Sequence, residues 1–202
     1  MIIVIATFRW FDGRLESRGM KSRKLLYGFM AIVGAVAGTA IASPAFAADS
    51  GPWEVQTFGK CLEVQGGSTA NSAQIQNWTC PSATGKIAPL HQRWIWRNLG
   101  NGYFRLINGK SGKCANVKGN SQETSAKIIQ YPCGGSTTYN DQWRMVLELK
   151  NHNGHDYYKI VSRSSEFCLG VQDNSAANGA DIIQRSCHSG AALITWVPAK
   201  QS

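Results

Sequence analysis

Several patterns are missing after residue 48 of this 202-residue sequence, and each absence narrows the class of protein. No long stretch repeats apolar residues every 3.6 positions, so helices are not expected to build the core. Lys and Arg are scattered there with no two adjacent. That distribution is typical of a solvated surface and argues against nucleic acid or an anionic membrane as partner. A G-x-S-x-G motif or comparable hydrolase signature is also missing.

Residues 1–47 differ in character from the rest. Met20–Lys24 is basic, Leu25–Ala42 is apolar, and Ala45-Phe46-Ala47 is a small-x-small site. These are the parts of a secretory signal peptide, so we predict cleavage after Ala47 and an extracellular protein. The cleavage site directly behind the apolar run argues against an uncleaved membrane anchor. Residues 1–19 match no part of a signal peptide, and we expect Met20 to be the initiator.

Residues 48–202 are predicted to be a single domain. Fifteen of the 21 Lys and Arg residues and ten of the 12 acids lie there, a balance of +5. A domain of this length buries roughly 70% of the surface of its extended chain, which is enough for a core. No linker or low-complexity segment divides it.

One pattern occurs three times in this domain, at intervals of 53 and 54 positions. Turn-forming pairs recur at matching offsets, where Asn and Gly tolerate positive φ. A repeat of this kind determines the architecture before any single motif. Each copy is predicted to be strand, turn, strand and a loop to a tryptophan. The matching residues are Val64, Val117 and Val171; Asn71-Ser72, Thr124-Ser125 and Asn178-Gly179; Ile75, Ile128 and Ile182; and Trp94, Trp143 and Trp196.

Further strands are expected before the cysteines. Trp53–Phe58 alternates in polarity, and Tyr103–Asn108 and Tyr157–Ser162 begin eleven positions before the first cysteine of their copies. Many short strands at regular spacing predict an all-β fold. The three tryptophans that end the copies are expected in its core.

The six cysteines lack the C-x2–4-C spacing of zinc sites, and no metal or other cofactor is predicted. An even set in an exported chain indicates disulfides. Pairing within each copy is the one pattern that treats the copies alike, and each bridge should contribute about 3 kcal/mol on the chain-entropy model. The predicted bridges are Cys61–Cys80, Cys114–Cys133 and Cys168–Cys187.

The three copies resemble the ricin-type β-trefoil lectins and ricin B-like carbohydrate-binding modules over residues 53–198. The first copy carries the resemblance best, with Cys61-Leu62-Glu63-Val64, Ile75–Cys80 and His91-Gln92-Arg93-Trp94. The resemblance implies a β-trefoil of three four-stranded units around a pseudo-three-fold axis. It also implies a Q-x-W element whose tryptophan packs in the core. The later copies keep only that tryptophan.

In that family each unit can hold one shallow sugar site, formed by a carboxylate, a polar residue, an aromatic ring, an Asn or His, and a Gln. The first copy offers Glu63, in place of the usual Asp, with Gln76, Trp78, His91 and Gln92. The second offers Asn116, Ile129, Tyr131, Asn140 and Asp141, so that acid and amide are exchanged. The third offers Gly170, Ile183, Arg185, Leu193 and Ile194, and has lost the polar set.

The residue chemistry agrees with this assignment. Gln76 and Trp78 are two positions apart on a strand and therefore share a face. An aromatic ring matches the C–H face of a sugar, and a carboxylate beside an amide matches its hydroxyls. We therefore predict that the first copy binds best, the second weakly or not at all, and the third not at all.

Three classes of function remain to be weighed. The favoured one is a secreted, non-catalytic lectin whose partner is a glycan or polysaccharide. The second is a β-trefoil that binds protein, such as an inhibitor or a toxin-complex subunit. The third is a small hydrolase, which would need paired carboxylates or a Ser/His/Asp set. His152, His155 and Asp156 lie in an Asn/Gly-rich turn and are expected to form a solvated loop tip.

Overall fold

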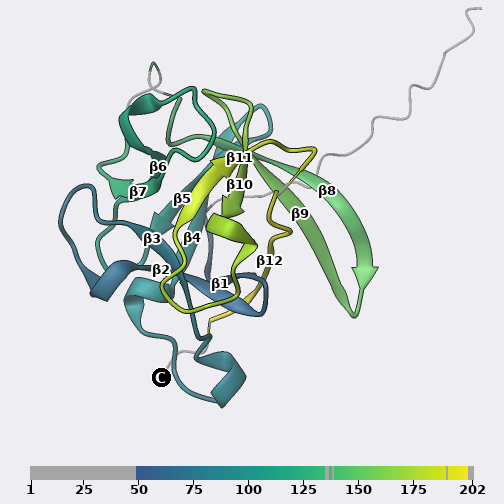
Figure 1. The fold of residues 1–202 in the computed structure, drawn as a ribbon. Coiled ribbons are helices and arrows are strands. Elements are labelled where there is room, and N and C mark those ends of the chain that lie inside the picture. Colours follow the sequence, from purple (N-terminus) through teal and green to yellow (C-terminus); the bar gives the residue numbers. More distant parts are fainter. Residues whose placement is uncertain (1–48, 135–136, 138, 190, 200–202) are drawn as a thin grey trace, which may run out of the picture. The chain divides into compact units, whose positions relative to one another are not determined.

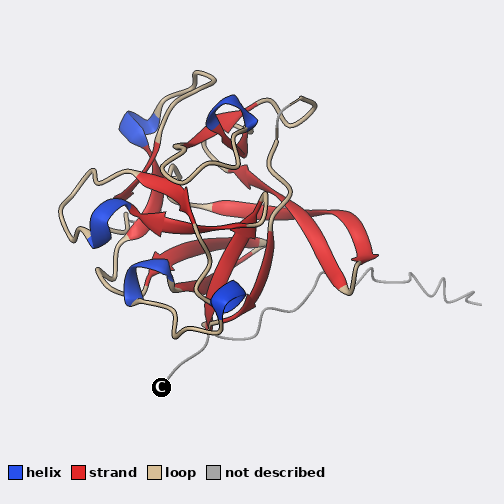
Figure 2. Cartoon of the chain, turned by 60° about the horizontal axis from the view of Figure 1, so that its bottom comes forward, coloured by secondary structure: helices blue, strands red, loops and turns tan. Residues whose placement is uncertain are grey.

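The computed structural model describes residues 49–134, 137, 139–189 and 191–199, and the predicted signal peptide lies outside them. The described chain consists of strands and single-turn 3-10 helices (Figures 1 and 2). No helix in these ranges is long and apolar enough to cross a membrane. The strands are β1 (Ser50–Thr57), β2 (Lys60–Val64), β3 (Ile75–Trp78), β4 (Trp94–Gly100), β5 (Tyr103–Asn108), β6 (Cys114–Val117), β7 (Ile128–Tyr131), β8 (Trp143–His152), β9 (His155–Ser162), β10 (Cys168–Val171), β11 (Ile182–Arg185) and β12 (Thr195–Pro198). The short helices are η1 (Gln65–Gly67), η2 (Ser82–Thr84), η3 (Leu90–Gln92), η4 (Lys118–Asn120) and η5 (Gln172–Asn174).

Six of the strands close into a barrel. Strand β1 pairs with β4 and β12, and the pairing continues from β4 through β5 and β8 to β9. A bridge between Tyr158 and Ile194 links β9 to the residue before β12 and completes the ring. Because the barrel is closed, its strands leave no open edge of unpaired backbone N–H and C=O groups. The remaining strands form the hairpins β2–β3, β6–β7 and β10–β11, one from each repeat. The predicted all-β trefoil is confirmed.

The repeat positions explain the core. The valines and isoleucines shared by the three copies are all buried in one cluster. All three predicted disulfides are present, and each ties the first strand of a hairpin to the segment that follows its second strand. Each closed loop removes entropy from the unfolded chain, so the bridges stabilise hairpins whose strands are only four or five residues long.

Two of the three tryptophans occupy the expected core position. Trp94 and Trp143 are fully buried and donate Nε1–H to the carbonyls of Leu62 and Ala115. The prediction that Trp196 is the counterpart of these two tryptophans is wrong by two residues. Phe104 pairs with Trp143 as Tyr158 pairs with Ile194, so Ile194 holds the equivalent place in the third repeat.

Trp196 lies two residues beyond that place and is partly buried. It stacks on Tyr158 at 4.9 Å between ring centroids and lies 5.4 Å from the ring of Trp96. The isoleucine cannot donate to a carbonyl. In the third repeat the backbone N–H of Ala192 bonds the Leu169 carbonyl instead.

Side-chain amides join neighbouring repeats. Gln130 of the second repeat donates to the carbonyls of Ser68 and Ala70 in the first. Gln184 of the third repeat donates in the same way to the second, at Ser121 (3.1 Å) and Glu123. Each of these glutamines also accepts a serine hydroxyl, from Ser111 and Ser165 respectively. We call each arrangement an amide clasp.

The first repeat has only a reduced version of the clasp. Asn77 takes the place of the glutamine, and its Nδ2 is 3.4 Å from the Ser175 carbonyl. Phe58 stands where the other repeats have the serine that donates to the glutamine, and Asn77 Oδ1 is buried with no partner in the described chain. The shorter side chain therefore holds the third repeat with a single weak bond.

The pseudo-three-fold axis carries three different side chains at one repeated position, namely Gln74, Lys127 and Asp181. Gln74 Nε2 lies 2.7, 3.1 and 3.1 Å from the carbonyls of the three equivalent isoleucines, Ile75, Ile128 and Ile182. Lys127 Nζ and Asp181 Oδ2 form an ion pair at 2.7 Å. The axis is thus filled by one amide and one pair of opposite charges.

Candidate functional site

The first repeat brings four of its five predicted residues into one polar group around Glu63. Glu63 on β2 lies opposite Gln76 on β3. Gln76 Nε2 donates to Glu63 Oε1 at 2.8 Å, and Gln92 Nε2, from the end of η3, donates to Oε2 at 2.7 Å. His91 Nε2 lies 3.5 Å from the same Oε2. One carboxylate thus reaches both amides.

These contacts determine which way both amides point. A carboxylate only accepts hydrogen bonds, so both glutamines must turn their nitrogens toward Glu63. Their oxygens point away, and Gln92 Oε1 is buried with no partner in the described part of the chain. Because Glu63 is only 4% exposed, the remaining lone pairs of its carboxylate are largely shielded from solvent.

Burial favours the neutral form of His91. Its pKa is lowered from the usual value, mainly because burial disfavours the charged imidazolium. Glu63 raises the pKa and the Lys110 ammonium lowers it, and burial prevails. Gly67 has a φ of +62°, which favours glycine, and an added Cβ would be tight, at 3.2 Å from His91 Nδ1 and 3.1 Å from Lys110 Nζ. A glycine here allows the imidazole to pack against the backbone.

Trp78 completes the first-repeat group as an exposed ring. It follows Gln76 by two positions on β3, so the two share a face of the hairpin. Trp78 pairs with Cys61 across the hairpin, which makes it the diagonal neighbour of Glu63. The side chain is 41% exposed although it lies next to a disulfide. A flat apolar surface therefore stands beside the buried carboxylate.

The second repeat has a well-formed pocket of about 460 Å³. Three of its predicted residues line this pocket: Asn116 on β6, Tyr131 on β7 and Asn140 from the following loop. Ile129, in place of an amide, lines it as well. The sequence did not identify the other contributors, which are Ser72 of the first repeat, η4 (Lys118–Asn120) and Thr137.

Asp141 does not join this pocket, and its predicted role is corrected. The side chain is fully buried, and Oδ2 accepts from Arg105 Nε at 2.8 Å and from the Gly134 N–H at 2.7 Å. Arg105 also donates to the Gly134 carbonyl. Asp141 follows Asn140 directly but points to the opposite side, where its charge neutralises a largely buried guanidinium.

The third repeat has no comparable polar group. Gly170 and Ile183 provide no hydrogen-bonding side chain, and Arg185 Nη1 donates to the Val171 carbonyl (3.2 Å) and to Asn174 Oδ1 (3.3 Å). The corrected register makes Ala191 and Ala192 the counterparts of His91 and Gln92, in place of Leu193 and Ile194. With either register this repeat lacks the acid, the amides and the ring.

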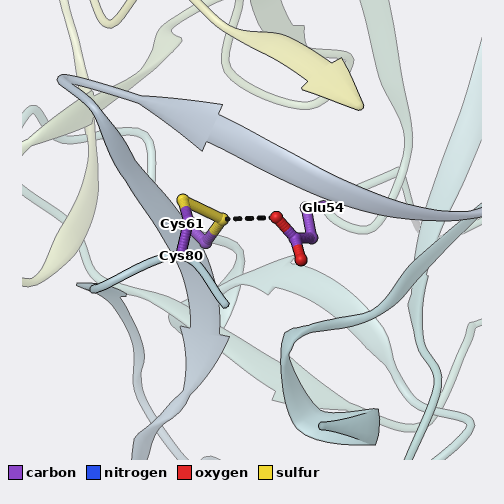
Figure 3. A group of neighbouring side chains, drawn as sticks. All are labelled: Glu54, Cys61 and Cys80. Atoms are coloured by element: carbon purple, nitrogen blue, oxygen red, sulfur yellow. Dashed lines mark hydrogen bonds between the residues drawn. A yellow bond between two sulfur atoms is a disulfide. The ribbon is translucent and has the colours of Figure 1, made fainter. Parts of the chain in front are cut away.

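Two groups resemble metal sites by proximity alone. Glu54 lies beside the sulfurs of Cys61 and Cys80 (Figure 3), and Asp141 lies beside those of Cys114 and Cys133. Because these sulfurs form disulfides, they cannot act as thiolate ligands. Glu54 instead accepts from the hydroxyl and the N–H of Ser82. The 3.5 Å contact between its Oε2 and Cys61 Sγ lacks a proton while the bridge is intact.

His152 and His155 face each other at the end of the β8–β9 hairpin. This hairpin extends away from its neighbours in Figure 1, and both residues are exposed. The turn between them contains Asn153 and Gly154 with positive φ. The two histidines are therefore part of an exposed loop tip, as the Asn/Gly composition indicated.

The class of protein follows from these features. A six-stranded barrel carries three disulfide-bonded hairpins, and two of the hairpins place polar side chains beside an exposed aromatic ring. This is a β-trefoil of the lectin type.

Comparison with known proteins identifies the family. The model for the ricin-type β-trefoil lectin domain-like family matches residues 90–185. The designed three-fold symmetric protein ThreeFoil is 30% identical, with a TM-score of 0.63, and the alignment covers 75% of this chain and all of ThreeFoil. The chain therefore belongs to the ricin-type β-trefoil lectin family and is a carbohydrate-binding module of the ricin B type. No curated protein sequence matches it significantly.

Other solved structures are similar over part of their length. An exo-β-1,3-galactanase from Clostridium thermocellum is 29% identical, with a TM-score of 0.63; the alignment covers 74% of this chain and 30% of the galactanase. A Polyporus squamosus lectin, bound to a human-type influenza-binding epitope, is 14% identical with a TM-score of 0.55; the alignment covers 76% of this chain and 49% of the lectin. At that identity the second likeness concerns the fold alone.

Proposed function

We propose that this protein is a secreted, non-catalytic lectin whose site for neutral sugars lies in the first repeat. One observation carries the proposal: the Glu63 carboxylate is held between two amides, beside an exposed tryptophan. Sugar hydroxyls donate to the free lone pairs of Glu63, and the C–H face of the ring packs on Trp78. Because the amides already orient the carboxylate, binding requires little rearrangement.

Galactose-containing glycans are the first ligands to examine. The similar region of the C. thermocellum protein belongs to an enzyme named for its action on β-1,3-galactan. We infer that the first repeat recognises a neutral, galactose-type sugar. Absence of catalysis is supported by the composition of the group, because glycoside hydrolysis requires two carboxylates and the five first-repeat residues include one acid.

Secretion is supported by two independent features. Residues 20–47 contain the basic, apolar and small-residue segments of a signal peptide. The described chain contains three disulfides and no free cysteine, which suits an oxidising compartment.

Calorimetric titration with β-1,3-galactobiose tests the first-repeat site, after a glycan array has ranked neutral ligands. Glu63→Ala should weaken binding by about 10- to 100-fold, since a hydrogen bond to a charged group contributes about 1.5–3 kcal/mol. Trp78→Ala should cause a comparable loss. Arg185→Ala in the third repeat is the matched control and should bind neutral sugar normally. If Arg185→Ala abolishes binding while the other two variants bind normally, the assignment is wrong.

A protein-binding trefoil is the second candidate, and one observation favours it. Val146, Leu147 and Leu149 on the extended β8–β9 hairpin are 36%, 46% and 37% exposed. Consecutive residues of a strand point to opposite faces, so these side chains place apolar surface on both faces of the hairpin, and exposed apolar surface is typical of protein contacts. A glycan array that stays silent across neutral and charged glycans would favour this candidate over the lectin.

A further inference from the structure

The second-repeat pocket differs from the first-repeat site in its hydrogen-bonding character. Asn140 Nδ2 lies 2.7 Å from Asn116 Oδ1 and 3.2 Å from the Val117 carbonyl. A backbone carbonyl only accepts, so the Asn140 atom that faces it must be the nitrogen. The Asn116 atom that faces this nitrogen must then be the oxygen. One carbonyl thus determines the orientation of both amides.

This orientation turns the Asn116 NH2 group away from Asn140. No acceptor among the described residues bonds Asn116 Nδ2, although the side chain is 95% buried. That atom is also not one of the fully enclosed polar atoms without a partner in the described part, so it remains accessible. A buried amide therefore offers two N–H donors to whatever enters the pocket.

The first repeat has the opposite chemistry at the same position. Glu63 and Asn116 each follow the first cysteine of their repeat by two residues. Glu63 can only accept hydrogen bonds, whereas the free group of Asn116 can only donate them. A sugar hydroxyl that donates to Glu63 therefore has no equivalent partner at Asn116. A ligand oxygen that only accepts would bind there more favourably.

A positive charge accompanies this change. Lys118 lines the second-repeat pocket, is exposed, and has no ion-pair partner among the described residues. The equivalent residues are Gln65 in the first repeat and Gln172 in the third. Among the three repeats the lysine occurs only in the second, although the third, with Gly170, also lacks the carboxylate. Without an acid in the pocket, an anionic ligand meets no like charge there.

From this geometry we infer that the second-repeat pocket binds a sugar that carries an anionic group, either the carboxylate of a uronic acid or a sulfate ester. Tyr131, 44% exposed, supplies the stacking surface for the ring. Asn116 Nδ2 and Lys118 Nζ donate to the anionic oxygens. The inference rests on the proposed function, since it assumes that the hairpin sites bind sugars, and it gives the two sites different ligands.

The test compares sugars of galactose configuration that differ at C6. Galacturonic acid, galactose 6-sulfate and galactose are titrated into the disulfide-bonded protein by calorimetry at low and high salt. We expect the Trp78→Ala variant, whose first site is disabled, to bind one or both anionic sugars at least about fivefold more tightly than galactose. That affinity should fall with salt, because exposed charges are screened. Preference for one anionic sugar identifies which of the two groups is recognised.

Substitutions at Lys118 and Asn116 test what each side chain contributes to binding of the anionic sugar. Lys118→Ala should weaken anionic binding by about five- to tenfold, whereas Lys150→Ala, a matched exposed lysine on β8, should not change it. Asn116→Asp keeps the acceptor for Asn140, so the fold should be retained, as circular dichroism can verify. It should abolish anionic binding by placing a carboxylate in the pocket.

The outcomes are distinguishable. If neither anionic sugar binds better than galactose, or if Lys118→Ala matches Lys150→Ala, the inference is overturned. If the unaltered protein still binds a neutral sugar and Trp78→Ala weakens that binding, the proposed lectin function remains supported. Silence toward every glycan overturns both.

Discussion

Shortening Gln184 by one methylene should loosen the second-repeat pocket from a distance. In Gln184→Asn the amide can no longer reach the carbonyls of Ser121 and Glu123 while it accepts from Ser165. Asn77 shows the consequence within the same molecule, since it keeps one contact at 3.4 Å and leaves its oxygen unpaired in the described chain. Two lost hydrogen bonds at about 1 kcal/mol each and one lost methylene at about 0.8 kcal/mol give a destabilisation of about 3 kcal/mol.

Thermal and urea unfolding measure this loss. For a domain of this size, about 3 kcal/mol corresponds to a fall in Tm of about 6–12 °C. Gln172→Asn on η5 is the matched control, because it makes the same change at an exposed glutamine. Hydrogen exchange should accelerate in residues 118–124, since the clasped segment directly follows η4. Equal Tm values for the two variants would refute the reasoning, as would normal exchange in that segment.

Three further predictions concern single residues and the leader. Because the folded-state pKa of His91 lies below its unfolded value of about 6.5, the unfolded chain takes up the proton first as the pH falls. Stability should therefore decrease below pH 6.5, and His91→Asn should show a smaller decrease in urea titrations at pH 7.5 and 5; an unchanged pH profile would contradict this. Asp141→Asn leaves Arg105 uncompensated and should cost about 3–5 kcal/mol, against less than about 1 kcal/mol for Asp49→Asn in the exposed pair with Arg97. Asp141→Asn that remains folded should bind neutral sugar normally. If it loses that binding, Asp141 is a binding residue after all. Intact mass of exported protein should show an N-terminus at Ala48, and a species that retains Leu25–Ala42 would favour a membrane anchor.

The repeats explain why so much of the fold could be predicted. Three copies in register identify the buried valines and isoleucines, the hairpin turns and the cysteine pairs, because a position that recurs is constrained three times. Ser72, Ser125 and Gly179 do adopt positive φ at the expected turns. The amide clasps were missed although the signal was present, since Gln130 and Gln184 both precede a second cysteine by three positions.

Where the repeats diverge, sequence alone was less informative. The loops before Trp94, Trp143 and Trp196 differ in length. The third-repeat site residues were assigned by their distance from Trp196, and this assignment was shifted by two residues because Ile194 holds the equivalent position. Asp141 was misassigned because its partner, Arg105, lies 36 positions away, and the basic residue at the matching position of the third copy, Lys159, pairs with Glu148 instead. The donor character of Asn116 depends on a carbonyl contact, which no sequence pattern encodes.

The three axial side chains bear on how such a molecule can arise from a single ancestral unit. Three identical chains meeting on one axis would place three copies of the same residue at the position of Gln74, Lys127 and Asp181. The 2.7 Å Lys127–Asp181 contact shows that residues at this position touch, so three ammonium groups or three carboxylates would repel one another there. Three neutral amides would not, and each could donate to the isoleucine carbonyls around it. Of the present repeats, only the first has an axial residue compatible with self-assembly of identical units as a trimer, whereas the charged pair in the other two requires units that differ in sequence.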